Sequence, residues 1–132
     1  MLPDRSAMLP PIALVLVVED EPHVAAVLHD ALIDLGYAVR LAEDGAAALA
    51  IAPVYRPDAV LLDLAMPEMP GDVVLERLRE ADPALPVIVV TGNADLERAR
   101  TTLAHGAFDY VAKPFDLEIL ARILAAAVIY RG

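Results

Sequence analysis

Four groups of polar side chains stand directly after apolar runs of the chain. In chain order they are Glu19-Asp20-Glu21, Asp63, Thr91 and Lys113. Short apolar runs bounded by turn-forming residues are typical of strands buried in a parallel sheet. Because the carboxyl ends of parallel strands meet at one edge, where open α/β sheets build their sites, we expect these side chains to converge.

The residue types in these groups predict a divalent cation and a phosphoryl group. Carboxylates brought together repel one another unless a cation neutralises them, and hard oxygen ligands suit Mg²⁺ (or Mn²⁺). A metal there would leave Asp63 ionised and nucleophilic, and would offset the charge of an incoming phosphoryl group. The Thr91 hydroxyl and the Lys113 ammonium could each donate to a phosphoryl oxygen.

Taken singly, each residue also has a structural explanation. Acidic residues 19–21 are favoured at a helix N-terminus, Asp63 could cap a turn or helix, and Thr91 could cap a strand end. Lys113 could be an ordinary solvated charge. It is, however, the only Lys beside nine Arg, which indicates that a compact point charge is needed there rather than a guanidinium fork. Together the set favours a site.

Strands alternating with helices must position these groups. Strands are predicted at 12–18, 37–41, 59–62, 86–90 and 107–112. Helices are predicted from 22 to about 35, from 44 to about 53, at 72–80, at 94–105, and from 115 to about 130. Pro22 opens the first helix with an acidic residue before it as cap. The apolar face of that helix is predicted to comprise Val24, Val27, Leu28, Ala31, Leu32 and Leu35.

Five strands alternating with five helices require a parallel sheet with right-handed crossovers, which makes the fold class α/β. We assign residues 12–130 to one domain and residues 1–11, which contain three Pro, to a flexible N-terminal tail. No internal repeat or linker divides the chain.

The bulk composition excludes several classes of function. With 132 residues, 58% of them hydrophobic, the chain is long enough for one ordered domain. A formal charge of −10 argues against direct nucleic-acid binding. The absence of Cys excludes disulfides and fits a cytoplasmic location. No apolar run approaches the roughly 20 residues that cross a membrane.

The motifs resemble those of the receiver (CheY-like) domain of bacterial two-component response regulators. The resemblance extends from Ile12 to Tyr130, and its order and spacing make it specific. It is carried by LVVEDEP (Leu16 to Pro22), LLDLAMPEMPG (Leu61 to Gly71), VIVVTGNA (Val87 to Ala94) and DYVAKPF (Asp109 to Phe115). The resemblance implies a doubly wound, flavodoxin-like sheet in the order 2-1-3-4-5.

The resemblance also implies roles for the site residues. Asp63 would accept a phosphoryl group from a sensor histidine kinase or a histidine phosphotransfer protein. Mg²⁺ would be held by Asp20, Asp63 and the backbone carbonyl of Ala65, with Glu19 acting mainly through water. Thr91 and Lys113 would contact the phosphoryl oxygens, and the bond before Pro114 is a candidate for the cis form.

A switch follows by the same resemblance. Phosphorylation would draw Thr91 inward, and Tyr110 would follow it, changing the surface of the fourth helix, fifth strand and fifth helix that a downstream protein reads. The last helix also carries Ile119, Ala126 and Tyr130 beside its core-facing stripe, and we hypothesise that this surface meets a partner or a second copy of the chain.

Two departures from the family pattern affect details only. Pro70 replaces a common Asp, which should stiffen the loop after Asp63. Ala65 and Asn93 occupy positions that tune the lifetime of the acyl phosphate in the family.

Two rival functions remain. A phosphatase with an Asp nucleophile and Mg²⁺ would need a second carboxylate two residues on, where Ala65 stands. A phosphorylation-independent pseudo-receiver, acting only by protein contacts, is disfavoured because the key positions carry competent residues. We therefore expect a signalling switch rather than an enzyme, either stand-alone or excised from a longer regulator.

Overall fold

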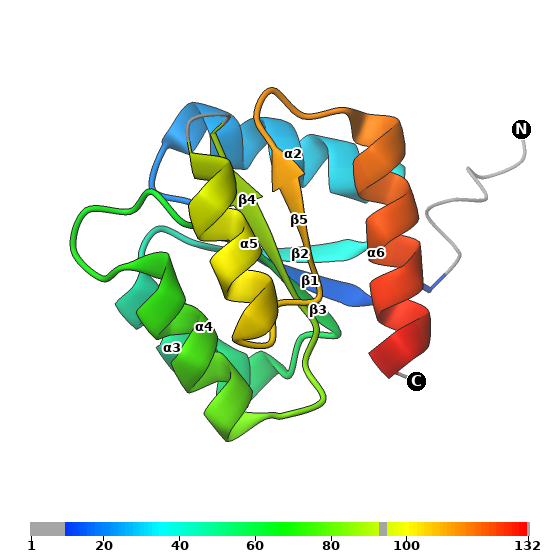
Figure 1. Cartoon of the computed structure of the whole chain (residues 1–132). Helices are drawn as coiled ribbons and strands as arrows, with labels where there is room; N and C mark the ends of the chain where they lie inside the picture. Colours follow the sequence, from blue (N-terminus) through cyan, green and yellow to red (C-terminus); the bar gives the residue numbers. More distant parts are fainter. Residues whose placement is uncertain (1–9, 93–94, 132) are drawn as a thin grey trace, which may run out of the picture.

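The computed structural model describes residues 10–92 and 95–131, within which five parallel strands form one sheet with five helices packed on its two faces (Figure 1). The strands are β1 (Leu14–Val18), β2 (Ala38–Ala42), β3 (Ala59–Asp63), β4 (Val87–Thr91) and β5 (Asp109–Ala112). The helices are α2 (Pro22–Asp34), α3 (Gly45–Tyr55), α4 (Gly71–Ala81), α5 (Leu96–Ala104) and α6 (Leu117–Arg131). The order β2-β1-β3-β4-β5 confirms the predicted fold class.

Two hydrophobic layers hold the sheet. On one face, Val15 and Val17 of β1 pack with residues of α2 and α6, whereas Leu16 and Val18 point to the other face, toward α3 and α4. Every residue of β3 and β4 is buried. Burial on both faces explains why these strands are continuous aliphatic runs rather than alternating ones.

The predicted apolar face of α2 was partly wrong. Leu28 and Leu32 are buried together with Ala25, but Val27 and Leu35 are exposed, at 58% and 39%. Val27 lies about 100° around the helix from Leu28, and Leu35 is the C-cap, beyond the last helical residue. The core-facing stripe is therefore narrower than the periodicity predicted.

The helix predicted to end near Pro53 continues to Tyr55. Pro53 lies in the last turn of α3, where it removes one hydrogen bond without preventing the turn. Arg56 ends the helix in the left-handed conformation, with φ 49°, and its N–H donates to the carbonyl of Ala52. The other ends agree with the predictions or differ by one or two residues. The predicted start of α5 at Ala94 and residues 1–9 of the predicted tail lie outside the described residues.

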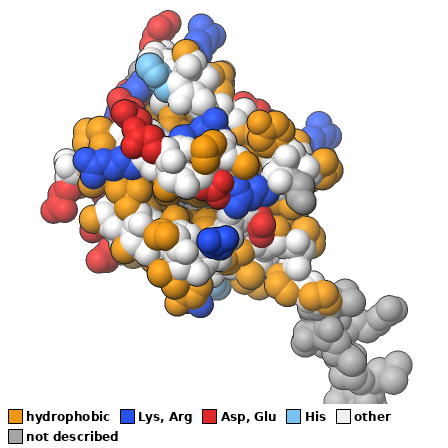
Figure 2. All heavy atoms as spheres, turned by 90° about the horizontal axis from the view of Figure 1, so that it is seen from below, with side chains coloured by type: hydrophobic (Ala, Val, Ile, Leu, Met, Phe, Trp, Pro, Cys, Tyr) orange, Lys and Arg blue, Asp and Glu red, His pale blue; other side chains and the backbone are white. Residues whose placement is uncertain are grey.

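Arginines gather near the ends of helices at the edge of the sheet opposite the carboxyl ends of the strands. Arg56 caps α3, Arg79 lies in the last turn of α4, and Arg131 ends α6, where its guanidinium pairs with Asp82 at 2.7 Å. Figure 2 views the molecule from below, where basic and acidic side chains are interspersed among hydrophobic ones. Cations there complement the negative ends of the helix dipoles.

The exposed side of α6 carries apolar residues, as its sequence predicted, beside the exposed pair Glu118 and Arg122. Ile119, Ile129 and Tyr130 are exposed at 48%, 80% and 67%, although the Tyr130 ring also packs on Phe108 with 5.5 Å between centroids. Among the helices of residues 10–92 and 95–131, none combines the length and apolarity needed to cross a bilayer.

Shortening a side chain to Ala should cost stability on the buried side of α6 but not on its exposed side. Leu124 is fully buried between α6 and the sheet, so Leu124→Ala should lower the free energy of unfolding by about 2–5 kcal/mol. Ile129→Ala, on the exposed side of the same helix, should change it by less than about 0.5 kcal/mol. Urea denaturation of the two variants compares them directly, and equal losses would contradict the described orientation of α6.

Candidate functional site

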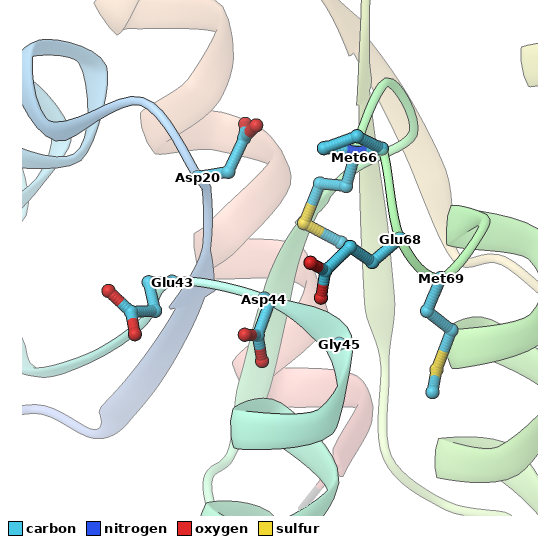
Figure 3. Close-up of a pocket in the computed structure, with 8 residues that line it drawn as sticks. Asp20, Glu43, Asp44, Gly45, Met66, Glu68 and Met69 are labelled. Atoms are coloured by element: carbon cyan, nitrogen blue, oxygen red, sulfur yellow. The ribbon is translucent and has the colours of Figure 1, made fainter.

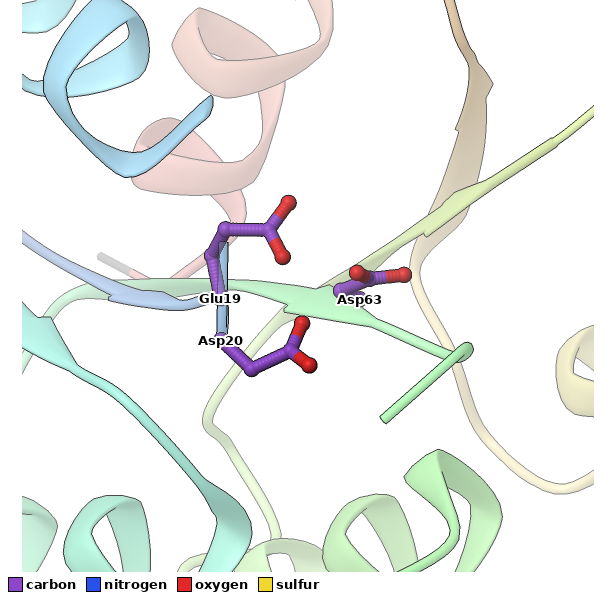
Figure 4. Close-up of side chains that lie close together, drawn as sticks. All are labelled: Glu19, Asp20 and Asp63. Carbon is purple, nitrogen blue, oxygen red and sulfur yellow. The ribbon is translucent and has the colours of Figure 1, made fainter. Parts of the chain in front are cut away.

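Three carboxylates meet where β1 and β3 end side by side. Glu19 and Asp20 follow β1, and Asp63 is the last residue of β3. One oxygen from each lies within 4.8 Å of the others (Figure 4). The strand order reverses between β1 and β3, which is where doubly wound sheets form their ligand crevice.

Lys113 joins this group from the end of β5. Its Nζ lies 3.1 Å from Glu19 Oε1 and 3.3 Å from Asp63 Oδ2. The Lys113 N–H donates to the carbonyl of Thr91, which holds the backbone at the end of β5 against the end of β4. The Lys113–Pro114 peptide bond is cis. The single Lys of the chain thus contacts two of the three carboxylates.

Two of the carboxylates are buried, so they depend on these contacts for compensation of their charge. Glu19 and Asp63 are each only 4% exposed, whereas Asp20 is exposed. Backbone donors hold the buried carboxylates: the Ala65 N–H donates to Asp63 Oδ1 at 3.0 Å, and the Glu21 N–H donates to Glu19 Oε2 at 3.3 Å. Glu21 is the N-cap of α2 before Pro22, as predicted, although its side chain makes no capping hydrogen bond.

The charges of the site are strongly coupled. Burial, together with the hydrogen bond and repulsion from Asp63, raises the pKa of Glu19 to about 7, although Lys113 acts in the opposite direction. Burial alone would lower the pKa of Lys113, but Glu19 and Asp63 more than offset it and hold that pKa above its ordinary value. Three carboxylates beside one ammonium therefore have an excess of negative charge.

The donor set fits a hard divalent cation. It consists of carboxylate oxygens without His or Cys, which suits Mg²⁺ or Mn²⁺ better than Zn²⁺. A pocket of about 190 Å³ opens beside Asp20, between the start of α3 and the loop after β3 (Figure 3). Its lining includes Glu43, Asp44 and Glu68, so this edge carries further negative charge.

Thr91 ends β4, whereas Tyr110 lies within β5 opposite Val89, and both face groups other than the carboxylates. The buried Thr91 hydroxyl donates to the carbonyls of Gly92 and Asp95, at 3.2 and 3.4 Å, and among the described residues it makes no hydrogen bond to a carboxylate. Tyr110 is half-buried against the hydrophobic layer on the α3 and α4 side of the sheet. Asn93 lies outside the described residues.

A family model for the response regulator receiver domain matches residues 15–125. The chain belongs to this family. The receiver domain is 40% identical over 114 residues to the regulatory protein AtoC of Escherichia coli, covering 86% of this chain and 25% of AtoC. It is 43% identical over 118 residues to the probable transcriptional regulatory protein TcrX of Mycobacterium tuberculosis, covering 89% of this chain and 50% of TcrX.

Solved structures agree with this assignment. A response regulator receiver domain protein from Clostridium thermocellum superimposes with a TM-score of 0.86 at 28% identity, covering 89% of this chain and 95% of that one. The receiver domain thus spans a quarter to a half of the two curated relatives, and nearly all of this solved neighbour. Receiver domains serve as switches in two-component signalling, and the acidic group described above is of the kind through which they bind Mg²⁺.

Sequence reasoning missed the acidic residues of the neighbouring pocket. Glu43 and Asp44 directly follow β2, so the rule that located Glu19 and Asp63 could have found them. Asp44 is also the N-cap of α3, where its Oδ1 accepts from the Ala47 N–H at 2.7 Å. Glu68 left no such signal, because it lies inside the loop after β3.

Without a divalent cation, the receiver domain should lose stability as pH rises from about 4.5 to about 7. The folded-state pKa of Glu19 is about 7, above its ordinary 4.5, so the folded chain binds an extra proton between these values. The resulting stability is present below pH 4.5 and lost as pH rises through 7, by roughly 1–3 kcal/mol.

Urea denaturation in a chelating buffer measures this dependence. Glu19→Gln should remove most of it, which separates Glu19 from the three His of the chain. Stability that rises between about pH 5 and 7 in the wild type but not in Glu19→Gln would contradict the assignment.

Proposed function

We propose that this receiver domain accepts a phosphoryl group on Asp63 from a phosphohistidine of a sensor kinase or phosphotransfer protein. The observation that carries the proposal is the contact of Lys113 Nζ with Asp63 Oδ2 at 3.3 Å, beside the carboxylates of Glu19 and Asp20. A buried Asp with both an ammonium and a cation site beside it suits attack on a charged phosphoryl group.

The transfer exchanges one bond to phosphorus for another. A carboxylate oxygen of Asp63 donates an electron pair to phosphorus, and the bond from phosphorus to the imidazole nitrogen breaks with its electron pair returning to the ring. Lys113 stabilises negative charge on the phosphoryl oxygens, since its ammonium already lies at Asp63. Asp20, Asp63 and the Ala65 carbonyl would hold Mg²⁺, with Glu19 acting through water. When bound, Mg²⁺ would offset phosphoryl charge.

The same site would switch the output surface. The Thr91 hydroxyl now donates to carbonyls at the start of α5, and a phosphoryl group on Asp63 would offer a charged, stronger acceptor. Moving the hydroxyl would release the segment leading to α5 and leave room for Tyr110, changing the surface of α5, β5 and α6. A downstream protein or domain would read that surface.

The rivals are less well supported. A pure interaction module would not require Lys113 beside a buried Asp63 and Glu19. A phosphatase would require an acid two residues after the nucleophile, and Ala65 cannot supply a proton. Self-association through the exposed side of α6 stays a prediction, and sedimentation of the protein with and without phosphorylation tests it.

Incubation with a small acyl phosphate and Mg²⁺ should add one phosphoryl group, detected by intact mass. Asp63→Asn should add none, because the amide is a poor nucleophile, and a chelator should abolish the addition. Asp34→Asn, an exposed Asp at the end of α2, is the matched control and should be modified as the wild type. Modification that persists in Asp63→Asn would place the acceptor elsewhere.

Asp20→Asn should weaken Mg²⁺ binding by roughly tenfold or more, because it removes one of the two carboxylates that would ligate the ion directly. Glu21→Gln changes the charge of the exposed neighbour by the same amount and should leave the affinity within about twofold. Titration with Mg²⁺ followed by amide NMR shifts compares the two. Equal losses would mean that general surface charge, not ligation, attracts the ion.

A further inference from the structure

The loop from Leu64 to Pro70 carries Ala65 away from Asp63 and returns the chain to the start of α4. Its beginning is held by two hydrogen bonds, from the Leu64 N–H to the carbonyl of Val90 at 3.1 Å and from the Ala65 N–H to Asp63 Oδ1. Its position must be defined closely, because a displaced Ala65 would break the second of these bonds and move the phosphoacceptor.

Gly71 closes the loop at its far end. A methyl group at Gly71 would lie 2.7 Å from Leu64 Cδ2, 2.8 Å from Leu64 Cα and 3.2 Å from the carbonyl oxygen of Asp63. Because two of these atoms belong to the backbone, no side-chain rotation could relieve the contact. The first residue of α4 therefore packs directly on the peptide that follows the phosphoacceptor.

Gly45 supports the same loop from a second element. It is the first residue of α3 and is buried, and Figure 3 places it across the pocket from Met66. A methyl group there would lie 2.6 Å from Val74 Cγ2 and 3.0 Å from Met69 Sδ. Val74 is stiff and fully buried in α4, so this contact also leaves little room to adjust.

Backbone conformation does not explain these two glycines. The glycines with positive φ among the described residues are Gly36 and Gly106, at 100° and 101°, whereas Gly45 and Gly71 have φ values open to other residues. What Gly45 and Gly71 provide is the absence of a side chain where two segments meet.

We propose that Gly45 and Gly71 are positioning residues for the phosphoacceptor site. Their close contacts hold the loop in place. The Ala65 N–H then keeps its hydrogen bond to Asp63 Oδ1, and the Ala65 carbonyl stays beside the cation position. The inference rests on the proposed function in one respect, the binding of Mg²⁺ at this site. Neither glycine touches the cation or the phosphoryl group.

The test measures two properties of Gly71→Ala and Gly45→Ala: Mg²⁺ affinity, and the amide NMR shifts of Leu64 and Ala65 in chelator. Each substitution should weaken Mg²⁺ binding by roughly tenfold, which is the lower end of the loss expected when a contact that orients a metal ligand is removed. Each should also change the NMR shifts of the Leu64 and Ala65 amides. Gly106→Ala is the matched control. It is strained by its positive φ and by contact with Arg79 Nε at 2.9 Å, so it should lower Tm yet leave both readouts unchanged.

A rescue separates positioning from general damage. Val74→Ala removes the atom nearest to the new methyl group, so Gly45→Ala/Val74→Ala should bind Mg²⁺ as tightly as Val74→Ala alone. If Gly71→Ala does not fold, Gly45→Ala and its rescue decide the question. Wild-type affinity and unshifted amides in the glycine variants would overturn the proposal, as would failure of the rescue. If the wild type itself binds no Mg²⁺, the metal site is wrong, and the amide shifts in chelator still decide whether the glycines position the loop.

Discussion

The structure depends on keeping two buried carboxylates together with one ammonium between them. Glu19 and Asp63 are almost fully buried, and a buried charge costs several kcal/mol unless partners compensate it. Lys113 contacts both, but one positive charge cannot neutralise them and Asp20 as well. Burial first, and the neighbouring Asp63 second, raise the pKa of Glu19 even with Lys113 beside it. The site is therefore prepared to gain positive charge, which is what a divalent cation brings.

The sheet is what makes such a site stable enough to exist. β1 and β3 are adjacent, and their side chains are buried in hydrophobic layers on both faces. The favourable burial of these strands offsets the cost of the charges at their ends. Because β1, β3 and β5 run parallel, their last residues reach the same edge, and repulsion between Glu19 and Asp63 cannot separate them without disrupting the core. The arginines at the opposite edge leave this end the more acidic one.

Much of this arrangement was predictable because it follows from one-dimensional patterns. Apolar runs located the strands, and the residue after each run located Glu19, Asp63 and Lys113. The exposure of Val27 was not predictable, since periodicity alone does not say how wide a helix face the sheet covers. Nor was the orientation of the Thr91 hydroxyl, because a hydroxyl rotates to whichever acceptor is near. The need for Gly45 also escaped prediction, because it arises from a contact with Met69 and Val74 that only the packed α3 and α4 create.

Under the proposed function, α5 is the element best suited to respond to a change at Asp63. It is the shortest helix that the structure describes, with nine residues, and its N-cap Asp95 makes no side-chain capping bond. Instead, the carbonyl of Asp95 accepts a long hydrogen bond from the Thr91 hydroxyl at 3.4 Å. Such a bond to a neutral acceptor is weaker than one to a phosphoryl oxygen. A hydroxyl with two competing acceptors needs only a small free-energy difference to exchange them, so a local change of charge would be enough to shift the population of α5 positions.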